Sequence, residues 1–437
     1  WHNKDILKKL GNVSWAESIR KLHQNSDNYL NSVFFRRLAY DEILANSLVL
    51  SQVRRRIKKI KKRKKKFNLN ISNKIIDNFN FILTKNQNVI INEINNDLKS
   101  DYKMFRLLQG DVGSGKTIVA LVAAANVINS NYQVALMAPT EILAKQHFNL
   151  AKKIFKSTDV SIEILTGKVG LKEKKIIKEK IRLGKIDFLI GTHALFQKSI
   201  EFKNLGFVII DEQHKFGVRQ RIELSNKGGN DCDILLMSAT PIPRTLILSV
   251  YGDMDVSRLV EKPKNRKSII TLSKPEEKTN EVITFIKKQI INGNQVFWIC
   301  PLIEESKNLN YTAAVEKHKL LSRIFENKVG LIHGGLDKEE KSNTLNKFLN
   351  KSLSILVATT VIEVGVDIPN ANIIIIENSN KFGLSQLHQL RGRVGRGEIQ
   401  GTCILLFKKN LSENARKRIN ILKSSNDGFF IAEEDMK

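Results

Sequence analysis

The stretch GDVGSGKT, residues 110–117, decides the fold class of this chain. It fits the pattern G-x-x-x-x-G-K-[ST], follows the apolar run MFRLLQ and opens the helix-forming stretch TIVALVAAANVI. A strand, a glycine-rich loop and a helix in this order form a phosphate-binding loop. We therefore expect ATP or GTP to bind here, held by backbone N–H groups and the helix N-terminus.

Two side chains of this loop have predicted chemical roles. Lys116 is expected to reach the β- and γ-phosphates, and the Thr117 hydroxyl is expected to hold Mg²⁺. The other positions are expected to surround the phosphates: Gly110, Asp111, Val112, Gly113, Ser114 and Gly115.

A second apolar run, IIDEQH at residues 209–214, ends in two carboxylates. Asp211 is expected to bind Mg²⁺ through its water shell, and Glu212 to polarise the attacking water. His214, beside the pair, is assigned a coupling role. A solvated strand end would also carry such residues, but the phosphate-binding loop upstream favours the catalytic interpretation.

Short apolar runs alternate with helical stretches from about residue 104 onward, which predicts an α/β fold with parallel sheets flanked by helices. The first group of runs is MFRLLQ, QVALMAPT, DFLIGTH, FVIIDEQ and ILLMSAT, and the second is VFWICPLI, VGLIHG, SILVATT, IIIIEN and GTCILLF. The pattern predicts a helical segment over 1–79, a first lobe over 80–262, a linker over 263–280 and a second lobe over 281–410.

The formal net charge of +28 favours a polyanionic partner such as nucleic acid, although solvated lysines from compositional bias would give the same value. The run RRRIKKIKKRKKK, residues 54–66, is either an exposed helix end or mobile loop, or an arm along a nucleic-acid backbone. No stretch is apolar and long enough to span a bilayer. The three cysteines are far apart, so we expect reduced, buried thiols in a cytoplasmic protein.

The segment QLHQLRGRVGRG, residues 386–397, places three arginines among glycines. Phosphoryl transfer requires positive charge on the γ-phosphate in the transition state, and arginine supplies it with two N–H donors. We predict that Arg393 and Arg396 reach the nucleotide from the second lobe, so that ATP closes a cleft between the lobes. A basic loop that binds a nucleic-acid backbone is the alternative.

With these residues in hand, the chain resembles the superfamily-two helicases and translocases, and among them the bacterial RecG branched-DNA helicases. The resemblance runs from about Phe34 to the end. It rests on the stretches RLLQGDVGSGKT, MAPTEILAKQH, IGTHALFQ, VIIDEQHKFGVRQR, SATPIPRT, LIEES, ATTVIEVGVDIPNA and QLHQLRGRVGRG. It implies two tandem RecA-like lobes, and SSNDGFFIAEEDM resembles the start of a translocation segment over 411–437.

The resemblance implies roles for further residues. Gln87 would read the adenine edge with Phe81 nearby, and Ser238 and Thr240 would link the ATP state to the DNA track. Residues expected to approach ATP from the second lobe are Glu363, Gly365, Asp367 and Gln389. Residues expected to line the nucleic-acid track are Pro139, Thr140, Thr166, Gly167, Thr192, His193, Thr359 and Thr360.

The implied function is an ATP-dependent DNA helicase or translocase that remodels stalled forks and Holliday junctions in recombination and repair. ATP and Mg²⁺ are the expected cofactors, and branched double-stranded DNA is the expected partner of a monomeric, nucleoid-associated bacterial protein. Two alternatives stay open: a transcription-repair coupling translocase, or a motor-inactive fragment that binds nucleic acid. No run of five short alternating strands precedes residue 110, so we expect a fragment without the family's wedge domain and without the end of its translocation segment.

Overall fold

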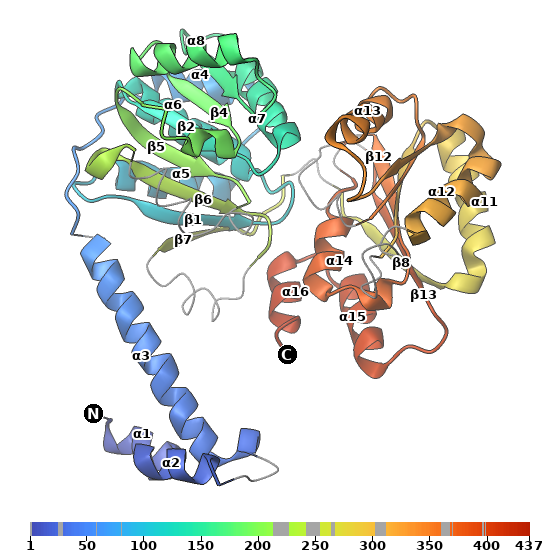
Figure 1. The fold of residues 1–437 in the computed structure, drawn as a ribbon, viewed down its shortest axis with the longest axis horizontal. Coiled ribbons are helices and arrows are strands. Elements are labelled where there is room, and N and C mark those ends of the chain that lie inside the picture. Colours follow the sequence, from blue (N-terminus) through green and yellow to red (C-terminus); the bar gives the residue numbers. More distant parts are fainter. Residues whose placement is uncertain are drawn as a thin grey trace. The chain divides into compact units, whose positions relative to one another are not determined.

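The computed structural model describes residues 2–24, 29–57, 59–79, 81–212, 227–241, 254–263, 267–301, 312–359, 368, 370–395, 397 and 399–437. The chain divides into two compact units, a helical one built mainly from residues 1–60 and a larger one that starts at Lys61. Figure 1 shows the elements of each unit. None of the helices in the described ranges is long and apolar enough to cross a membrane.

The helical unit contains α1 (Lys4–Lys9), α2 (Trp15–Leu22), η1 (Tyr29–Asn31) and the long helix α3 (Val33–Ile57). Ser14 caps α2, because its hydroxyl accepts a hydrogen bond of 3.1 Å from the Glu17 N–H. The turn before α2 requires a glycine: Gly11 has a φ of +77°, and α2 packs against α3 just beyond it.

The first sheet of the larger unit has the strand order β3-β4-β2-β5-β6-β1-β7, and every pairing whose register is defined is parallel. Its strands are β1 (Phe105–Gly110), β2 (Gln133–Met137), β3 (Ile162–Leu165), β4 (Phe188–Gly191), β5 (Leu205–Ile210), β6 (Asp233–Ser238) and β7 (Asp255–Leu259). The accompanying helices are α4 (Asn70–Asn78), α5 (Lys85–Lys99), α6 (Lys116–Asn129), α7 (Glu141–Ile154) and α8 (Leu171–Arg182), with the short turns η2 (His193–Phe196) and η4 (Gly229–Asp231). Figure 1 shows α6 and α7 along this sheet, where α6 packs on β2 and α7 on β4.

The second sheet has the order β10-β11-β9-β12-β13-β8 and is parallel throughout. Its strands are β8 (Ile270–Pro275), β9 (Gln295–Ile299), β10 (Val329–Ile332), β11 (Ile355–Ala358), β12 (Ala371–Ile376) and β13 (Thr402–Phe407). The helices are α11 (Thr279–Ile291), α12 (Thr312–Phe325), α13 (Lys338–Leu349), α14 (Leu384–Arg391), α15 (Glu413–Ser424) and α16 (Gly428–Glu434), with η5 (Glu276–Lys278), η6 (Glu326–Lys328) and η8 (Ser379–Lys381). Side chains alternate between two apolar layers, since Phe297 packs in one cluster and its neighbour Trp298 in the other.

The predicted fold class is confirmed: two parallel sheets flanked by helices follow a helical N-terminal segment. All ten apolar runs that the sequence indicated contain strands, but β3, β7 and β8 were missed. Each of these three is an edge strand, half exposed to solvent and therefore less apolar. As a consequence the expected linker 263–280 contains β8, which pairs with β13 in the second sheet.

The thiols are buried, as expected from the sequence. Cys232, Cys300 and Cys403 are free and fully enclosed. Burial raises the pKa of Cys232 and of Cys403 to about 12, which keeps both as inert thiols at neutral pH.

The basic run 54–66 is partly an internal structural element, which neither interpretation of the sequence anticipated. The side chains of Lys62 and Lys65 are completely buried, and their ammonium groups lie 2.7 and 2.6 Å from Oδ2 of Asp233. Lys62 also donates to the carbonyls of Asp97 and Leu98, at 2.9 and 3.3 Å. Its neighbours Arg63 and Lys64 remain exposed, so these two side chains are available to a polyanion while Lys62 and Lys65 are not.

We expect Asp233→Asn to destabilise the larger unit strongly. The substitution keeps the shape of the side chain but leaves two buried ammonium groups without a counter-charge, which costs about 3–5 kcal/mol. Equilibrium urea unfolding followed by circular dichroism would measure the loss. Asp231→Asn is the matched control, because Asp231 pairs at 3.6 Å with the exposed Arg63 and should change stability by less than about 1 kcal/mol. Equal effects of the two substitutions would contradict the buried-pair account.

Candidate active site

The phosphate-binding loop between β1 and α6 has the backbone geometry that its glycines permit. Gly113 and Gly115 have φ values of +77° and +90°, which other residues rarely adopt. Gly115 is the N-cap residue of α6 and has no room for a side chain, because a Cβ there would collide with Nε2 of Gln87. Lys116 donates from its ammonium group to the carbonyls of Gly110 and Asp111, at 2.7 and 2.9 Å.

Gln87 on α5 contacts the phosphate-binding loop through its side-chain amide. It is buried at the start of α5, where it forms a reciprocal capping box with Thr84. Its Nε2 donates to the Ser114 carbonyl at 3.0 Å. Phe81 is half exposed and packs edge-on against Phe79, with ring centroids 5.5 Å apart. The adenine-reading role of Gln87 stays a prediction, but the amide is in direct contact with the loop.

The two carboxylates lie where β5 ends. Burial alone would raise the pKa of Asp211. The hydrogen bond and charge of His147, and the charge of Lys116, lower this pKa below its ordinary value. The His147 Nε2 lies 2.8 Å from Oδ2 of Asp211. Glu212 adopts a left-handed φ of +48°, and its Oε2 accepts from the Ala239 N–H at 3.4 Å. Burial is the largest cause that raises the pKa of Glu212, and the charge of Asp211 is the second. The charges of Lys116 and Arg393 oppose this rise. A carboxylate with a raised pKa beside an ionised partner suits a general base and a cation ligand.

Thr117 and Asp211 together offer a hydroxyl and a carboxylate oxygen, which are the hard ligands that Mg²⁺ prefers. Thr117 lies half-buried in the first turn of α6. Within the described ranges no group of three or more His, Cys, Asp or Glu side chains could hold a metal ion by itself. The donor set therefore fits an ion that also uses phosphate oxygens and water as ligands.

The arginines of segment 386–397 divide into different environments. Arg393 is 3% exposed, and its charge acts on the Glu212 carboxyl. Arg391 is 1% exposed and donates to the carbonyls of Leu422 and Ser425, at 2.6 and 2.8 Å. Arg391 therefore connects α14 to the end of α15, while the nucleotide-site role of Arg393 stays a prediction. Arg396, the other predicted finger, lies outside the described residues.

Two histidines of the site were missed from the sequence, although both fall in the stretches that carried the resemblance. His147 on α7 is the partner of Asp211. His388 on α14 lies with Nε2 3.2 Å from Oδ1 of Asp111 and with Nδ1 2.8 Å from the Arg391 guanidinium. Burial opposes ionisation of Asp111, but His388, Lys262 and the Gly428 N–H lower its pKa to about 2. The Asp111 side chain thus joins the loop to α14 and α16.

Ser238 and Thr240 lie on either side of Ala239, whose N–H contacts the Glu212 carboxylate. The Ser238 hydroxyl donates to the Thr240 carbonyl at 3.0 Å and lies 2.8 Å from the Thr240 hydroxyl. Ala239 between them holds Glu212 through its N–H. This arrangement is compatible with the predicted coupling role, because a movement of Glu212 would act directly on the 238–240 segment.

The predicted nucleic-acid residues occupy the carboxyl ends of strands in both sheets. Thr166, Thr192 and Thr359 have buried side chains, so contacts from these positions would use the backbone. Thr140 caps α7 by accepting from the Leu143 N–H at 3.3 Å, and Pro139 beside it is half-buried. The exposed members are Gly167 and His193.

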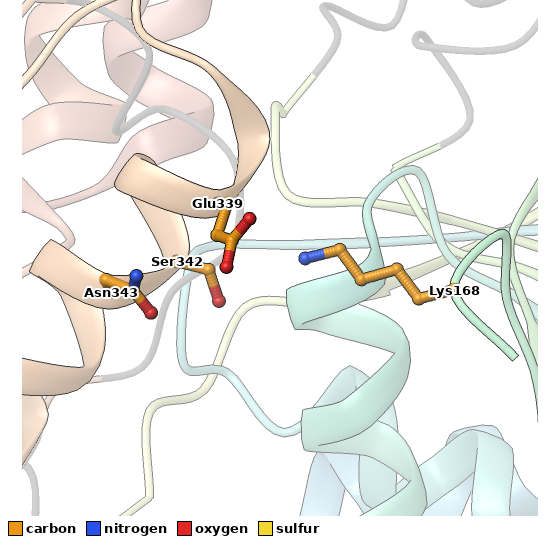
Figure 2. A pocket seen from close by; sticks show the side chains of 4 residues that line it. All are labelled: Lys168, Glu339, Ser342 and Asn343. Atoms are coloured by element: carbon orange, nitrogen blue, oxygen red, sulfur yellow. The ribbon is translucent and has the colours of Figure 1, made fainter.

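A cavity of about 590 Å³ opens beside Gly167. Figure 2 shows Lys168 extending its ammonium group toward Glu339 of α13, with Ser342 and Asn343 on the same helix. The cavity is polar on both sides, with a cation on one wall and a carboxylate and amide on the other.

The other predicted cofactor contacts are placed as follows. Val112 lies against Gly392 of the 386–397 segment, and Ser114 is buried within the loop. Gln389 is half-buried on α14. Besides Arg396, the predicted residues that lie outside the described ranges are His214, Thr360, Glu363, Gly365 and Asp367.

Comparison with known proteins agrees with this geometry. Residues 84–247 match the DEAD/DEAH box helicase family, and residues 277–398 match the helicase conserved C-terminal domain. The fold and the two family matches therefore place the chain in the class of two-lobed superfamily-two helicases.

Relatives with more than 40% sequence identity indicate which family within this class the chain belongs to. The ATP-dependent DNA helicase RecG of Bacillus subtilis is 44% identical over 426 residues, which are 97% of this chain and 62% of the relative. RecG of Aquifex aeolicus is 45% identical over 443 residues, 99% of this chain and 56% of the relative. A solved structure of RecG bound to a three-way DNA junction superposes with a TM-score of 0.84 at 41% identity, covering 100% of this chain and 58% of that one. The chain belongs to the RecG family, and it spans about 60% of the length of these relatives.

Proposed function

We propose that this chain is the ATP-hydrolysing motor of a RecG-type helicase that translocates on double-stranded DNA and remodels branched DNA in recombination and repair. The observation that carries the proposal is the contact between the phosphate-binding loop of the first lobe and α14 of the second, where Nε2 of His388 lies 3.2 Å from Oδ1 of Asp111. The charge of Arg393, also on the second lobe, opposes the rise in the pKa of Glu212. A site completed by both lobes converts nucleotide binding and hydrolysis into lobe movement.

In this mechanism each group has a defined task. Lys116 and the N-terminus of α6 bind the phosphates, and Glu212 accepts the proton of the attacking water. Mg²⁺, held by Thr117 and Asp211, would neutralise phosphate charge. Arg393 stabilises the charge on the transferred phosphoryl group, with Arg396 and Gln389 beside it. Gln87 orients the adenine, and the 238–240 segment transmits the change to the DNA track.

The remaining assignments follow from family membership. The division predicted from the sequence is kept with two adjustments: residues 61–79 join residues 80–262 in the first motor lobe, and β8 joins residues 281–410 in the second. Residues 1–60 act as a helical linker, and residues 411–437 as the start of the translocation segment. Arg391 connects this last segment to the second lobe, because it donates to the carbonyls of Leu422 and Ser425. We further propose that the protein acts as a monomer in the bacterial cytoplasm, associated with the nucleoid.

Steady-state ATP hydrolysis tests the proposal, measured without DNA, with linear duplex and with a synthetic fork, at two salt concentrations. We expect stimulation by DNA that weakens as salt rises, because binding releases counterions from the phosphate backbone. Preference for the fork would place junction recognition partly in these residues. Equal stimulation by fork and duplex would place it outside them. Retained DNA binding without any stimulation would reject the motor and favour a passive nucleic-acid-binding segment.

A further inference from the structure

Gln109 is a buried amide with an unusual lack of hydrogen bonds. It is the second-to-last residue of β1, directly before Gly110, and its side chain is 0% exposed. Neither Oε1 nor Nε2 has a hydrogen-bond partner among the residues that the structure describes. Buried amides are nearly always hydrogen-bonded, because an unsatisfied one retains the full cost of leaving water.

Another buried glutamine of the same sheet shows how this fold satisfies such a group. Gln133, at the start of β2, donates to the carbonyls of Ile181 and Ile186 at 3.0 and 2.8 Å. Its Oε1 accepts from the Asn204 N–H at 3.0 Å. Gln109, in the strand that enters the phosphate-binding loop, thus differs from Gln133 in having neither amide atom paired within the described residues.

The strand register places Gln109 beside the segment that we expect to couple ATP to DNA. Gln109 is aligned with Ser238 of β6, and Figure 1 shows the two strands as neighbours. The preceding pair, Leu108 and Met237, faces the core cluster formed with α5 and α6, so Gln109 and Ser238 both face the opposite side of the sheet. Neighbouring strands are about 4.8 Å apart, so a rotation of either side chain brings the amide within reach of the Ser238 hydroxyl.

Glu212 extends the same row on the far side of β6. Ile210 is aligned with Leu236, so Glu212 follows β5 at the level of Ser238. Its carboxylate already contacts the Ala239 N–H. A shift of Glu212 on nucleotide binding would therefore pull on Ala239 and break the pairing between Ser238 and Thr240.

We propose that Gln109 is a positioning residue that receives the Ser238 hydroxyl when nucleotide is bound. Without nucleotide, Ser238 bonds to Thr240 and the Gln109 amide is unsatisfied. With nucleotide, Ser238 turns to Gln109, Thr240 is released, and the 238–240 segment takes its DNA-coupled arrangement. The unsatisfied amide thus raises the free energy of the nucleotide-free state and favours the bound one. This inference rests on the proposed motor function, since it specifies how that motor is coupled.

The substitution Gln109→Met tests the proposal, because methionine has a similar size and shape but no amide. The matched control is Gln133→Met, which removes a buried amide with all its hydrogen bonds in place. For each protein we would measure the melting temperature with and without Mg²⁺ and the non-hydrolysable analogue AMP-PNP, the Kd for AMP-PNP, and ATP hydrolysis with and without duplex DNA.

For Gln109→Met we expect a nucleotide-free melting temperature equal to or above that of the wild type. The Kd for AMP-PNP should rise about tenfold, the effect of one lost hydrogen bond, and AMP-PNP should raise the melting temperature less. Basal kcat should stay within about twofold, and stimulation by DNA should be lost. Gln133→Met should instead melt at a lower temperature with and without nucleotide, with an unchanged Kd.

A lower nucleotide-free melting temperature for Gln109→Met with an unchanged Kd would overturn the proposal, because it would show a structural amide satisfied by bound water. Full wild-type stimulation by DNA would overturn it as well. Failure of the motor function is distinguishable: the wild type itself would then show no stimulation by DNA. The melting temperatures and the Kd would still decide the role of Gln109.

Discussion

Lys116→Ala is expected to lower ATP turnover by a factor on the order of 10³, because it removes the ammonium group that neutralises the phosphates in a buried site. The loss should have a second component. Lys116 also lowers the pKa of both Asp211 and Glu212, so its removal raises both values and weakens the cation ligand. Measurement of kcat at saturating ATP, together with binding of a fluorescent ATP analogue, would separate the loss of chemistry from the loss of binding.

The fold should survive this substitution. The ammonium group of Lys116 donates to the carbonyls of Gly110 and Asp111, so its removal should lower the free energy of unfolding by about 1–3 kcal/mol. Lys175→Ala on the exposed face of α8 is the control, with no expected change in turnover. Turnover by Lys116→Ala within threefold of the wild type would show that the loop does not bind the reacting phosphates.

Arg393→Ala should also reduce turnover by a factor on the order of 10³, the effect of removing an arginine finger, while ATP affinity changes by less than about tenfold. Its charge opposes the rise in the pKa of Glu212, the carboxyl that we propose as the general base. Single-turnover hydrolysis by the pre-bound complex would report the chemical step. Hydrolysis at the wild-type rate would show that the finger assignment of Arg393 is wrong.

The pH dependence supplies an independent measurement for this variant. Arg393 opposes the rise in the pKa of Glu212 that burial and Asp211 cause, so its removal lets that pKa rise further. A general base works only when ionised, so the acidic limb of the kcat profile should move to higher pH in Arg393→Ala. Arg393→Lys keeps the charge but loses the forked pair of donors. It should therefore keep the wild-type acidic limb while remaining slow.

Substitution of Arg391 is a useful comparison for Arg393→Ala, because the two arginines have different contacts. Two residues away in sequence, Arg391 binds the Leu422 and Ser425 carbonyls and the His388 ring. Its removal would leave buried acceptors unpaired and lower the stability of the second lobe. We therefore expect the larger loss of stability for Arg391→Ala, and for Arg393→Ala a loss that falls mainly on turnover.

The sequence determined the features that depend on neighbours along the chain. A phosphate-binding loop needs eight contiguous residues between a strand and a helix, and β1, Gly113, Gly115 and α6 supply them. Central strands are buried on both faces, so β2, β5 and β9 are apolar at most positions and were found. The edge strands β3, β7 and β8 were missed because one side is exposed and their composition resembles that of loops.

The tertiary structure decided which chemically similar residues take which role. Lys62 and Lys65 belong to a basic run whose composition is typical of a solvent-exposed segment. Both are nevertheless buried, because they pair with Asp233, about 170 residues later in the chain. Arg391 and Arg393 share one short motif, but packing of α14 against α15 buries one among carbonyls and leaves the other to act on Glu212. The pattern of apolar and charged residues along a segment indicates how buried that segment is on average. The partner of an individual charged side chain depends instead on contacts between residues far apart in sequence. Only the folded chain brings those residues together.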